Sequence, residues 1–173
     1  MMSQAHKTRT GASAIAIDAA LRPGDFGTIV HKHGTLYAAE YGLDGTFEAY
    51  VAEPLAAFVK ATPNAGCIWF AHHDGEFAGS IAIVRHEQGQ GQLRWFLVDP
   101  AFRGLGLGSR LIAEAMAYCE RQRLADVHLW TFEGLNAAAA LYERQGFHVT
   151  KRKQEHAWGR QLTLVHMAMK RSV

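Results

Sequence analysis

The sequence predicts a mixed α/β fold of about seven strands and about four helices, arranged in one domain. Strand-like and helix-like hydrophobic patterns follow each other along the chain, with no internal repeat and no interdomain linker. At 173 residues, with 49% hydrophobic and 20% charged residues, the chain has the composition of an ordinary globular protein. We expect residues 14–173 to form this domain and residues 1–13 to be a flexible tail.

The first part of the chain predicts one strand and two helices. Alternating apolar residues indicate a strand over Ala14–Leu21. Asp25 is expected to be the N-cap of a helix whose inner face carries Phe26, Ile29 and Val30. Apolar residues at helical spacing predict a second helix over about Thr46–Lys60.

The remainder of the chain predicts a hairpin and then alternating strands and helices. The turn signal Asp74-Gly75 joins strands expected at Cys67–Ala71 and Phe77–Arg85. A turn at Gly89–Gly91 leads to a fourth strand, Leu93–Val98. The elements that follow are a helix with one apolar stripe (Leu111, Ile112, Ala115, Met116, Cys119), a strand (Val127–Phe132), a short helix ended by Gly146 (Asn136–Gln145) and two closing strands (Phe147–Arg152, Leu162–Met169).

The charges and cysteines set limits on partners and location. The formal net charge is +2 and the charges are dispersed, which argues against a nucleic-acid or membrane partner. Cys67 and Cys119 lie in apolar stretches and are expected to be reduced core residues. No run resembles a signal peptide or a membrane span, so a soluble, cytoplasmic protein is the expectation.

The segment from Val98 to Ile112 carries the clearest functional signal. An apolar strand ends, a turn with three glycines follows, and an amphipathic helix begins at once. Such a turn removes side chains from the helix N-terminus, so its free N–H groups can approach phosphate oxygens closely. The P-loop pattern is absent, and Ser109 stands where a dinucleotide fingerprint requires glycine or alanine. A glycine-rich turn without a ligand stays an alternative.

Two motifs together resemble the GNAT N-acetyltransferase superfamily. They are R-x-x-G-x-G, beginning at Arg103, and L-Y-x-x-x-G-F, beginning at Leu141. The resemblance spans Ala14 to Lys170 and implies a mostly antiparallel sheet that is splayed between strands four and five. Arg22 to Asp44 also resembles acetyltransferase domains that follow a MarR-type winged helix in bacterial fusions. No winged helix fits before Ala14, so the expectation is the catalytic half alone.

The resemblance implies acetyl-CoA as co-substrate and no metal. Backbone N–H groups of the glycine turn would hold the pyrophosphate, and the fourth strand would pair with the pantetheine. The asparagine that the family often places seven residues before its tyrosine is Leu135 here. The contact of that asparagine with pantetheine would be either absent or made by Asn136 with shifted geometry. The coenzyme-binding residues implied are Phe96, Leu97, Val98, Arg103, Gly104, Leu105, Gly106, Leu107, Gly108, Ser109 and Asn136.

Acyl transfer to an amine needs an acid and a base. Tyr142 stands where the family places its general acid, which protonates the departing thiolate. The carboxylate base that several relatives carry at the start of the fourth strand is Gln92 here, and an amide is no useful base. Glu133 is the predicted base, with Glu40 or a chain of waters as alternatives.

The first two helices are implied to cover the acceptor, with Glu40, Tyr41 and Trp130 as substrate-binding residues. From His33 to Val59 all charged residues are acidic, which favours a cationic amine. These acids are Glu40, Asp44, Glu48 and Glu53, and a solvated helix face is an equal interpretation. The paired histidines (His31 with His33, His72 with His73) diverge and do not indicate a metal site.

The hypothesis is an acetyl-CoA-dependent N-acetyltransferase that acts in a ternary complex on a primary amine of a small molecule, amino acid or peptide. The alternative from another class is a non-catalytic acyl-CoA-binding sensor. Acyl transfer to oxygen and longer acyl chains also stay open. Exposed edge strands allow a homodimer.

Overall fold

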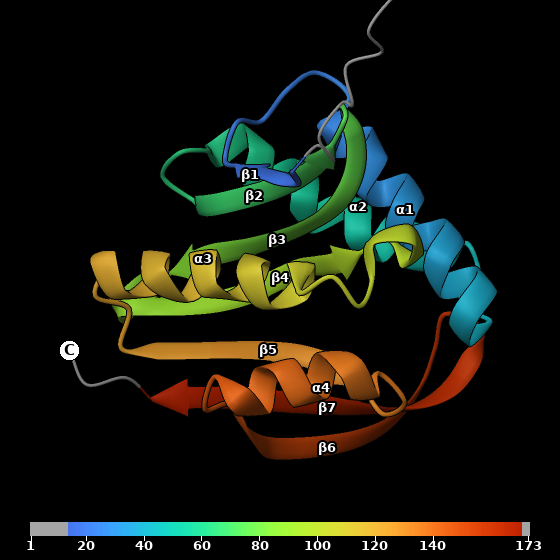
Figure 1. The fold of residues 1–173 in the computed structure, drawn as a ribbon. Coiled ribbons are helices and arrows are strands. Elements are labelled where there is room, and N and C mark those ends of the chain that lie inside the picture. The colour runs from blue at the N-terminus through green and yellow to red at the C-terminus, as the bar shows by residue number, and fades with distance from the viewer. Residues whose placement is uncertain (1–13, 171–173) are drawn as a thin grey trace, which may run out of the picture.

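The computed structural model describes residues 14–170 and contains one seven-stranded sheet (Figure 1). Along the sheet the strands lie in the order β1-β2-β3-β4-β5-β7-β6, and all neighbours are antiparallel except the parallel pair β4 and β5. This confirms the fold class expected from the sequence. The strands are β1 (Ala16–Asp18), β2 (Gly66–His73), β3 (Glu76–His86), β4 (Gln90–Val98), β5 (Asp126–Phe132), β6 (His148–Ala157) and β7 (Arg160–Lys170).

Helices cover both faces of the sheet. The helices are α1 (Asp25–Tyr41), α2 (Thr46–Ala61), α3 (Leu107–Arg121) and α4 (Asn136–Arg144), with short 3-10 turns at Glu87–Gly89 and Pro100–Phe102. One buried cluster joins the sheet to α3 and α4, and it includes the predicted stripe from Leu111 to Cys119. A second cluster joins the other face to α1 and α2, around Ile29, Leu55 and Phe70. Figure 1 shows α3 and α4 in front of the sheet and α1 and α2 beside and behind it.

Three local expectations are wrong. The first strand has only three residues, Ala16–Asp18, rather than the span from Ala14 to Leu21. Asp25 is not the N-cap of α1: Gly24 takes that place with φ +97°, and the Asp25 carboxylate accepts a hydrogen bond from the Arg22 amide at 2.6 Å. The turn before β4 lies at Glu87–Gly89, so β4 begins at Gln90.

Two of the hairpin turns are two-residue turns with left-handed backbone. Asp74 and Gly75 have φ values of +50° and +83°, which confirms the predicted two-residue turn between β2 and β3. Trp158 and Gly159, with φ values of +51° and +76°, form an equivalent turn between β6 and β7. That turn was not expected from the sequence, so β6 and β7 both run further than predicted.

A bulge in β4 changes the direction of its side chains. Ala82 of β3 pairs with Arg94 and Ser80 pairs with Leu97, so Trp95 and Phe96 together oppose one residue of β3. Trp95 has φ +47°, and its carbonyl oxygen accepts a hydrogen bond of 2.8 Å from the buried Ser80 hydroxyl. This bond holds the bulge in place because the Trp95 carbonyl leaves the regular ladder there.

Strands β4 and β5 separate after three paired positions. They pair at Gln90–Asp126, Gly91–Val127 and Gln92–His128, and the pairing ends there. Figure 1 shows the two strands close at the left and diverging toward the right. The edge of β4 that faces β5 is therefore without a strand partner from Leu93 onward, as the resemblance implied.

Within residues 14–170 every helix is too short or too polar to cross a lipid bilayer.

Ser80→Ala is expected to lower the free energy of unfolding by about 1–2 kcal/mol, because it leaves the Trp95 carbonyl without its buried donor. Urea unfolding measures the change. Thr35→Ala is the control, since its exposed hydroxyl donates only to the His31 carbonyl of its own helix. Equal effects of the two substitutions would contradict the role assigned to Ser80.

Candidate functional site

The glycine turn presents a run of unpaired backbone amides. Gly104 and Gly106 have φ values of +76° and +74°, a conformation that suits glycine, and Gly106 is the N-cap of α3 without a side-chain hydrogen bond. Between Gly104 and Ser109 no amide donates to an acceptor within the described residues. These donors lie at the positive end of the α3 dipole, so the turn is built to bind an anion.

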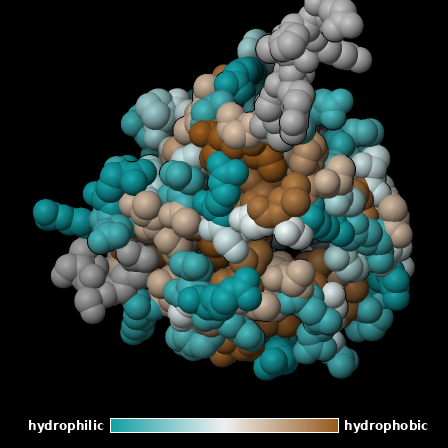
Figure 2. Space-filling view, viewed as in Figure 1, coloured by the Kyte–Doolittle hydropathy of each residue, from teal (hydrophilic) through white to brown (hydrophobic). Residues whose placement is uncertain are grey.

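A cavity of about 640 Å³ extends from this turn along β4 to α4, and we call it the glycine-loop cavity. Ten of the eleven predicted coenzyme-binding residues line it; the exception, Leu105, points to solvent with 63% of its surface exposed. Figure 2 shows apolar side chains gathered around a depression in the middle of this face, between α3 and α4. The ten residues are Phe96, Leu97, Val98, Arg103, Gly104, Gly106, Leu107, Gly108, Ser109 and Asn136.

A second cavity of about 490 Å³, the aromatic cavity, adjoins the first. The two share Tyr37, Phe96, Leu135 and Ala138, so they meet where β4 and β5 separate. The aromatic residues that line the aromatic cavity are Tyr37, Phe47, Tyr50, Trp95, Phe96, Trp130, Phe132, Tyr142 and Trp158. The pair of cavities forms a path through the gap in the sheet, with an anion site at one end.

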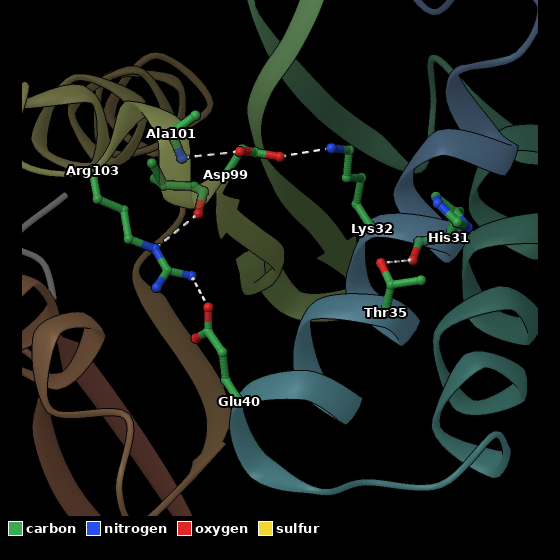
Figure 3. A network of polar contacts seen from close by, with 8 residues as sticks. His31, Lys32, Thr35, Glu40, Asp99, Ala101 and Arg103 are labelled. Atoms are coloured by element: carbon green, nitrogen blue, oxygen red, sulfur yellow. Dashed lines mark hydrogen bonds and ion pairs between the residues drawn. The ribbon is translucent and has the colours of Figure 1, made fainter.

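Helix α1 is tied to the glycine turn by two ion pairs (Figure 3). Lys32 lies 2.6 Å from Asp99, and Glu40 lies 2.8 Å from Arg103. Asp99 also accepts a hydrogen bond from the Ala101 amide. Burial acts to raise the pKa of Asp99, but the bonds from Lys32 and Ala101 outweigh it and hold the pKa below its ordinary value. The Asp99 and Glu40 carboxylates therefore hold the glycine turn in place against α1.

Tyr142 of α4 lies at the junction between the two cavities. Its ring is 5.9 Å from that of Phe96, which lines both, and only 6% of the residue is exposed. Burial and the neighbouring Tyr37 raise the pKa of the Tyr142 phenol, so it is protonated at neutral pH. Its hydroxyl makes no hydrogen bond to another described residue. It is therefore a proton donor that lacks an acceptor.

The tip of the β6–β7 hairpin closes the aromatic cavity against α2. The Trp158 ring lies 5.0 Å from that of Phe47 and 4.8 Å from that of Tyr50. The Asp44 amide donates to the Trp158 carbonyl at 3.0 Å, and Arg160 donates to the Tyr41 carbonyl at 2.7 Å. This contact joins the two halves of the sheet on the far side of the gap.

The acidic residues of the first two helices, which were expected beside the acceptor, do not line the aromatic cavity. Glu40 lines the glycine-loop cavity and is paired with Arg103, while Asp44 accepts hydrogen bonds from Thr46. Neither Glu48 nor Glu53 lines either cavity. The carboxylate that does line the aromatic cavity is Glu155, and it lies 2.6 Å from the Lys153 ammonium.

The other predicted residues fall on both sides of the gap. Trp130 lines the aromatic cavity, and Tyr41 lines the glycine-loop cavity. Glu133 lines neither, is 56% exposed and is paired with Arg152 at 3.2 Å. In residues 14–170 no group of three or more potential ligands is arranged to hold a metal.

Two polar residues of the aromatic cavity, His33 and Arg94, were missed from the sequence. His33 is 4% exposed, and its Nδ1 donates to the Ile29 carbonyl at 2.8 Å, which leaves Nε2 as the acceptor. Burial lowers the pKa of His33 to about 4. Arg94 was visible as one charge inside an apolar strand, whereas the burial of His33 had no signal in the sequence.

A family model described as the acetyltransferase (GNAT) family matches residues 30–147, which is more than half of the chain. The chain belongs to the GNAT acetyltransferase family. Membership confirms the predicted N-acetyltransferase, with acetyl-CoA as its acyl donor. The unpaired amides and the free edge of β4 fit that co-substrate.

Individual relatives agree with this assignment. An uncharacterised N-acetyltransferase of Schizosaccharomyces pombe is 30% identical over 144 residues, covering 80% of this chain and 86% of the relative. A mycothiol acetyltransferase of Salinispora tropica is 51% identical over 97 residues, which cover 53% of this chain and 29% of that enzyme. An acetyltransferase structure from Salmonella typhimurium, solved with its cofactor acetyl-CoA, has a TM-score of 0.73 at 19% identity, covering 91% of this chain and 94% of the other.

Gly106→Ala is expected to weaken acetyl-CoA binding by about tenfold or more, because a side chain at φ +74° is strained by roughly 1–2 kcal/mol and the amides around it shift. Calorimetric titration measures the affinity. Gly27→Ala, in an exposed stretch of α1 with nothing within 4 Å of the added carbon, is the control and should leave binding unchanged. Unaltered affinity in Gly106→Ala would contradict the anion site.

Lowering the pH from about 6.5 to about 4 is expected to reduce the free energy of unfolding through His33. Its pKa is depressed only in the folded state, so between these values the unfolded chain binds the extra proton. The effect amounts to at most about 3 kcal/mol. Chemical unfolding as a function of pH measures it, with His33→Asn as the variant that keeps a donor to Ile29. If the free energy of unfolding falls equally steeply with pH in His33→Asn, groups other than His33 are responsible.

Proposed function

We propose that this protein transfers the acetyl group of acetyl-CoA directly to a primary amine, with both substrates bound at once. The observation that carries the proposal is the meeting of the two cavities at Phe96 and Tyr142, at the point where β4 and β5 separate. One cavity has an anion site for the coenzyme, and the other has room for an acceptor. The buried Cys119 lies on the inner face of α3 and lines neither cavity, which favours direct attack over an acyl-enzyme.

The chain holds the coenzyme through its backbone. Amides from Gly104 to Ser109 would bind the pyrophosphate, and the unpaired edge of β4 around Leu97 would pair with the pantetheine amides. A backbone N–H of Leu97 or Val98 would donate to the thioester carbonyl and stabilise negative charge on its oxygen. The Val98 carbonyl already accepts a hydrogen bond of 3.3 Å from Arg103, so the pairing relies on its neighbours. When bound, the coenzyme supplies an activated acetyl group and a thiolate leaving group.

Tyr142 would donate its phenolic proton toward the coenzyme sulfur as the thiolate leaves. The phenol is neutral and its hydroxyl has no protein acceptor, so the proton is available. The ordinary pKa of a phenol already exceeds that of a thiol, which is about 8.5, and burial raises the pKa of Tyr142 further. A strong hydrogen bond to the sulfur is therefore favoured over complete proton transfer. Tyr142 would thus stabilise negative charge on sulfur.

We propose that water removes the proton from the attacking amine. Gln92 lines the aromatic cavity, but its amide is no base. Glu155 also lines the cavity and forms an ion pair with Lys153. Glu133, the residue predicted for this task, is exposed and paired with Arg152, and Glu40 is paired with Arg103. A chain of waters through the aromatic cavity needs none of these carboxylates, and substrate positioning then supplies much of the rate.

Several features stay predictions. They are the cytoplasmic location, the homodimer and the likeness to acetyltransferase domains of MarR-type fusions. The tail at residues 1–13 lies outside the described residues. Residues 14–170 fold around one sheet, which supports a single acetyltransferase domain.

Tyr142→Phe is expected to lower kcat by about 10²-fold, within the range of a general acid, and to leave the affinity for acetyl-CoA unchanged. Release of the coenzyme thiol with a panel of amines measures kcat, and calorimetry measures binding. Tyr118→Phe is the matched control, because Tyr118 packs on Trp69 and lines neither cavity. Thiol release that survives in Tyr142→Phe would remove this residue from the mechanism.

A further inference from the structure

Arg94 is a charged side chain of the aromatic cavity that has no counter-ion. It is half-buried on β4, and its guanidinium carbon lies 5.8 Å from the Tyr50 ring centre and 5.1 Å from that of Trp95. No carboxylate among residues 14–170 pairs with it. The carboxylate that lines this cavity, Glu155, is bound to Lys153 instead.

The surroundings of Arg94 penalise its charge and do not remove it. Burial lowers the pKa of the guanidinium, and the one neighbour that acts in the opposite direction is the Tyr50 phenol. Arginine still stays protonated, because its ordinary pKa lies far above neutral. Ring faces offset part of the lost hydration, but they accept none of its directed N–H hydrogen bonds. The Arg94 guanidinium is therefore available to bind an anion that enters the cavity.

The bulge in β4 places the Trp95 side chain next to Arg94. Because the strand is irregular at Trp95, both consecutive side chains contact α2: Arg94 lies over Tyr50, and Trp95 packs on Phe58 at 5.4 Å. The Trp95 indole N–H is buried and has no acceptor among the described residues. Neither the Arg94 guanidinium nor the Trp95 indole N–H thus has a hydrogen-bond acceptor among the described residues.

The lining of the cavity favours a carboxylate over a phosphate. One guanidinium matches a single carboxylate with two parallel hydrogen bonds, whereas a phosphate dianion would leave a charge unbalanced among aromatic rings. The other lysine or arginine of the cavity lining, Lys153, lies 2.6 Å from the Glu155 carboxylate and so has a counter-ion of its own. The remaining walls include Trp130, Phe132 and Trp158, which would bury an apolar group.

We propose that the acceptor is an amino acid with an apolar side chain, and that Arg94 binds its carboxylate. The amine then lies toward Phe96 and Tyr142, and the side chain lies against the aromatic walls. This proposal rests on the proposed acetyltransferase reaction and names its substrate class. It replaces the cationic acceptor predicted from the acids of α1 and α2, which do not line the cavity.

The test compares amino acids with their amides, which differ only in the anionic group. Thiol release is measured with L-phenylalanine and L-leucine against L-phenylalaninamide and L-leucinamide. Arg94→Gln is expected to lower kcat/KM for the acids by at least tenfold and for the amides by less than twofold. For each substrate, kcat/KM of the variant is divided by that of the wild type. This ratio cancels the difference in basicity between the amine of the acid and the amine of the amide. Arg121→Gln, on the exposed end of α3, is the control and should change neither value.

A binding readout without turnover accompanies the kinetics. N-acetyl-L-phenylalanine should raise the Tm of the wild type and not that of Arg94→Gln. Should that variant fail to fold, Arg94→Lys keeps the positive charge but loses the bidentate hydrogen-bond geometry. It is expected to lose part of the preference for amino acids over their amides. Equal losses for acids and amides, or turnover confined to amines without a carboxylate, would overturn the proposal while leaving the acetyltransferase reaction intact. Failure of every amine to release thiol would instead contradict the proposed function.

Discussion

The separation of β4 from β5 after Gln92 is the constraint on which the site depends. Parallel strands that stayed paired would bury the edge of β4 and leave no room between the sheet halves. Once pairing stops, the edge from Leu93 onward keeps its unpaired backbone groups, and a gap opens that two cavities share. In the proposed reaction this gap is where the coenzyme and the acceptor meet.

The parts around this gap are held by a few polar bonds. Ser80 fixes the Trp95 carbonyl and thereby the bulge that turns Arg94 toward α2. Lys32 and Glu40 fasten α1 to the turn after β4 through Asp99 and Arg103 (Figure 3). Since α1 also carries His33 into the aromatic cavity, the glycine turn and the aromatic cavity share one helix. A displacement of α1 would therefore alter both cavities together.

The sequence predicted most of the elements and the glycine turn at the start of α3, because these depend on local signals. The glycine turn, the apolar stripe of α3 and the Asp74-Gly75 hairpin each follow from a few neighbouring residues. The lining of the aromatic cavity could not be predicted in full, because it depends on contacts between distant segments. The acidic residues lie on or between α1 and α2, which carry some of the cavity's lining residues. Glu40 nevertheless forms an ion pair with Arg103, and the other acidic residues line neither cavity. The left-handed Trp95 had no sequence signal, since a bulky residue seldom takes that conformation.

The hairpin between β6 and β7 has a consequence for selectivity. At its tip Trp158 packs against Phe47 and Tyr50 at the edge of the aromatic cavity. The Trp158 carbonyl and the Arg160 guanidinium bind the backbone of the α1–α2 corner. This hairpin, rather than the sheet alone, thus supplies part of the cavity wall through the Trp158 indole. A smaller side chain at this position would enlarge the cavity on the side that faces α2.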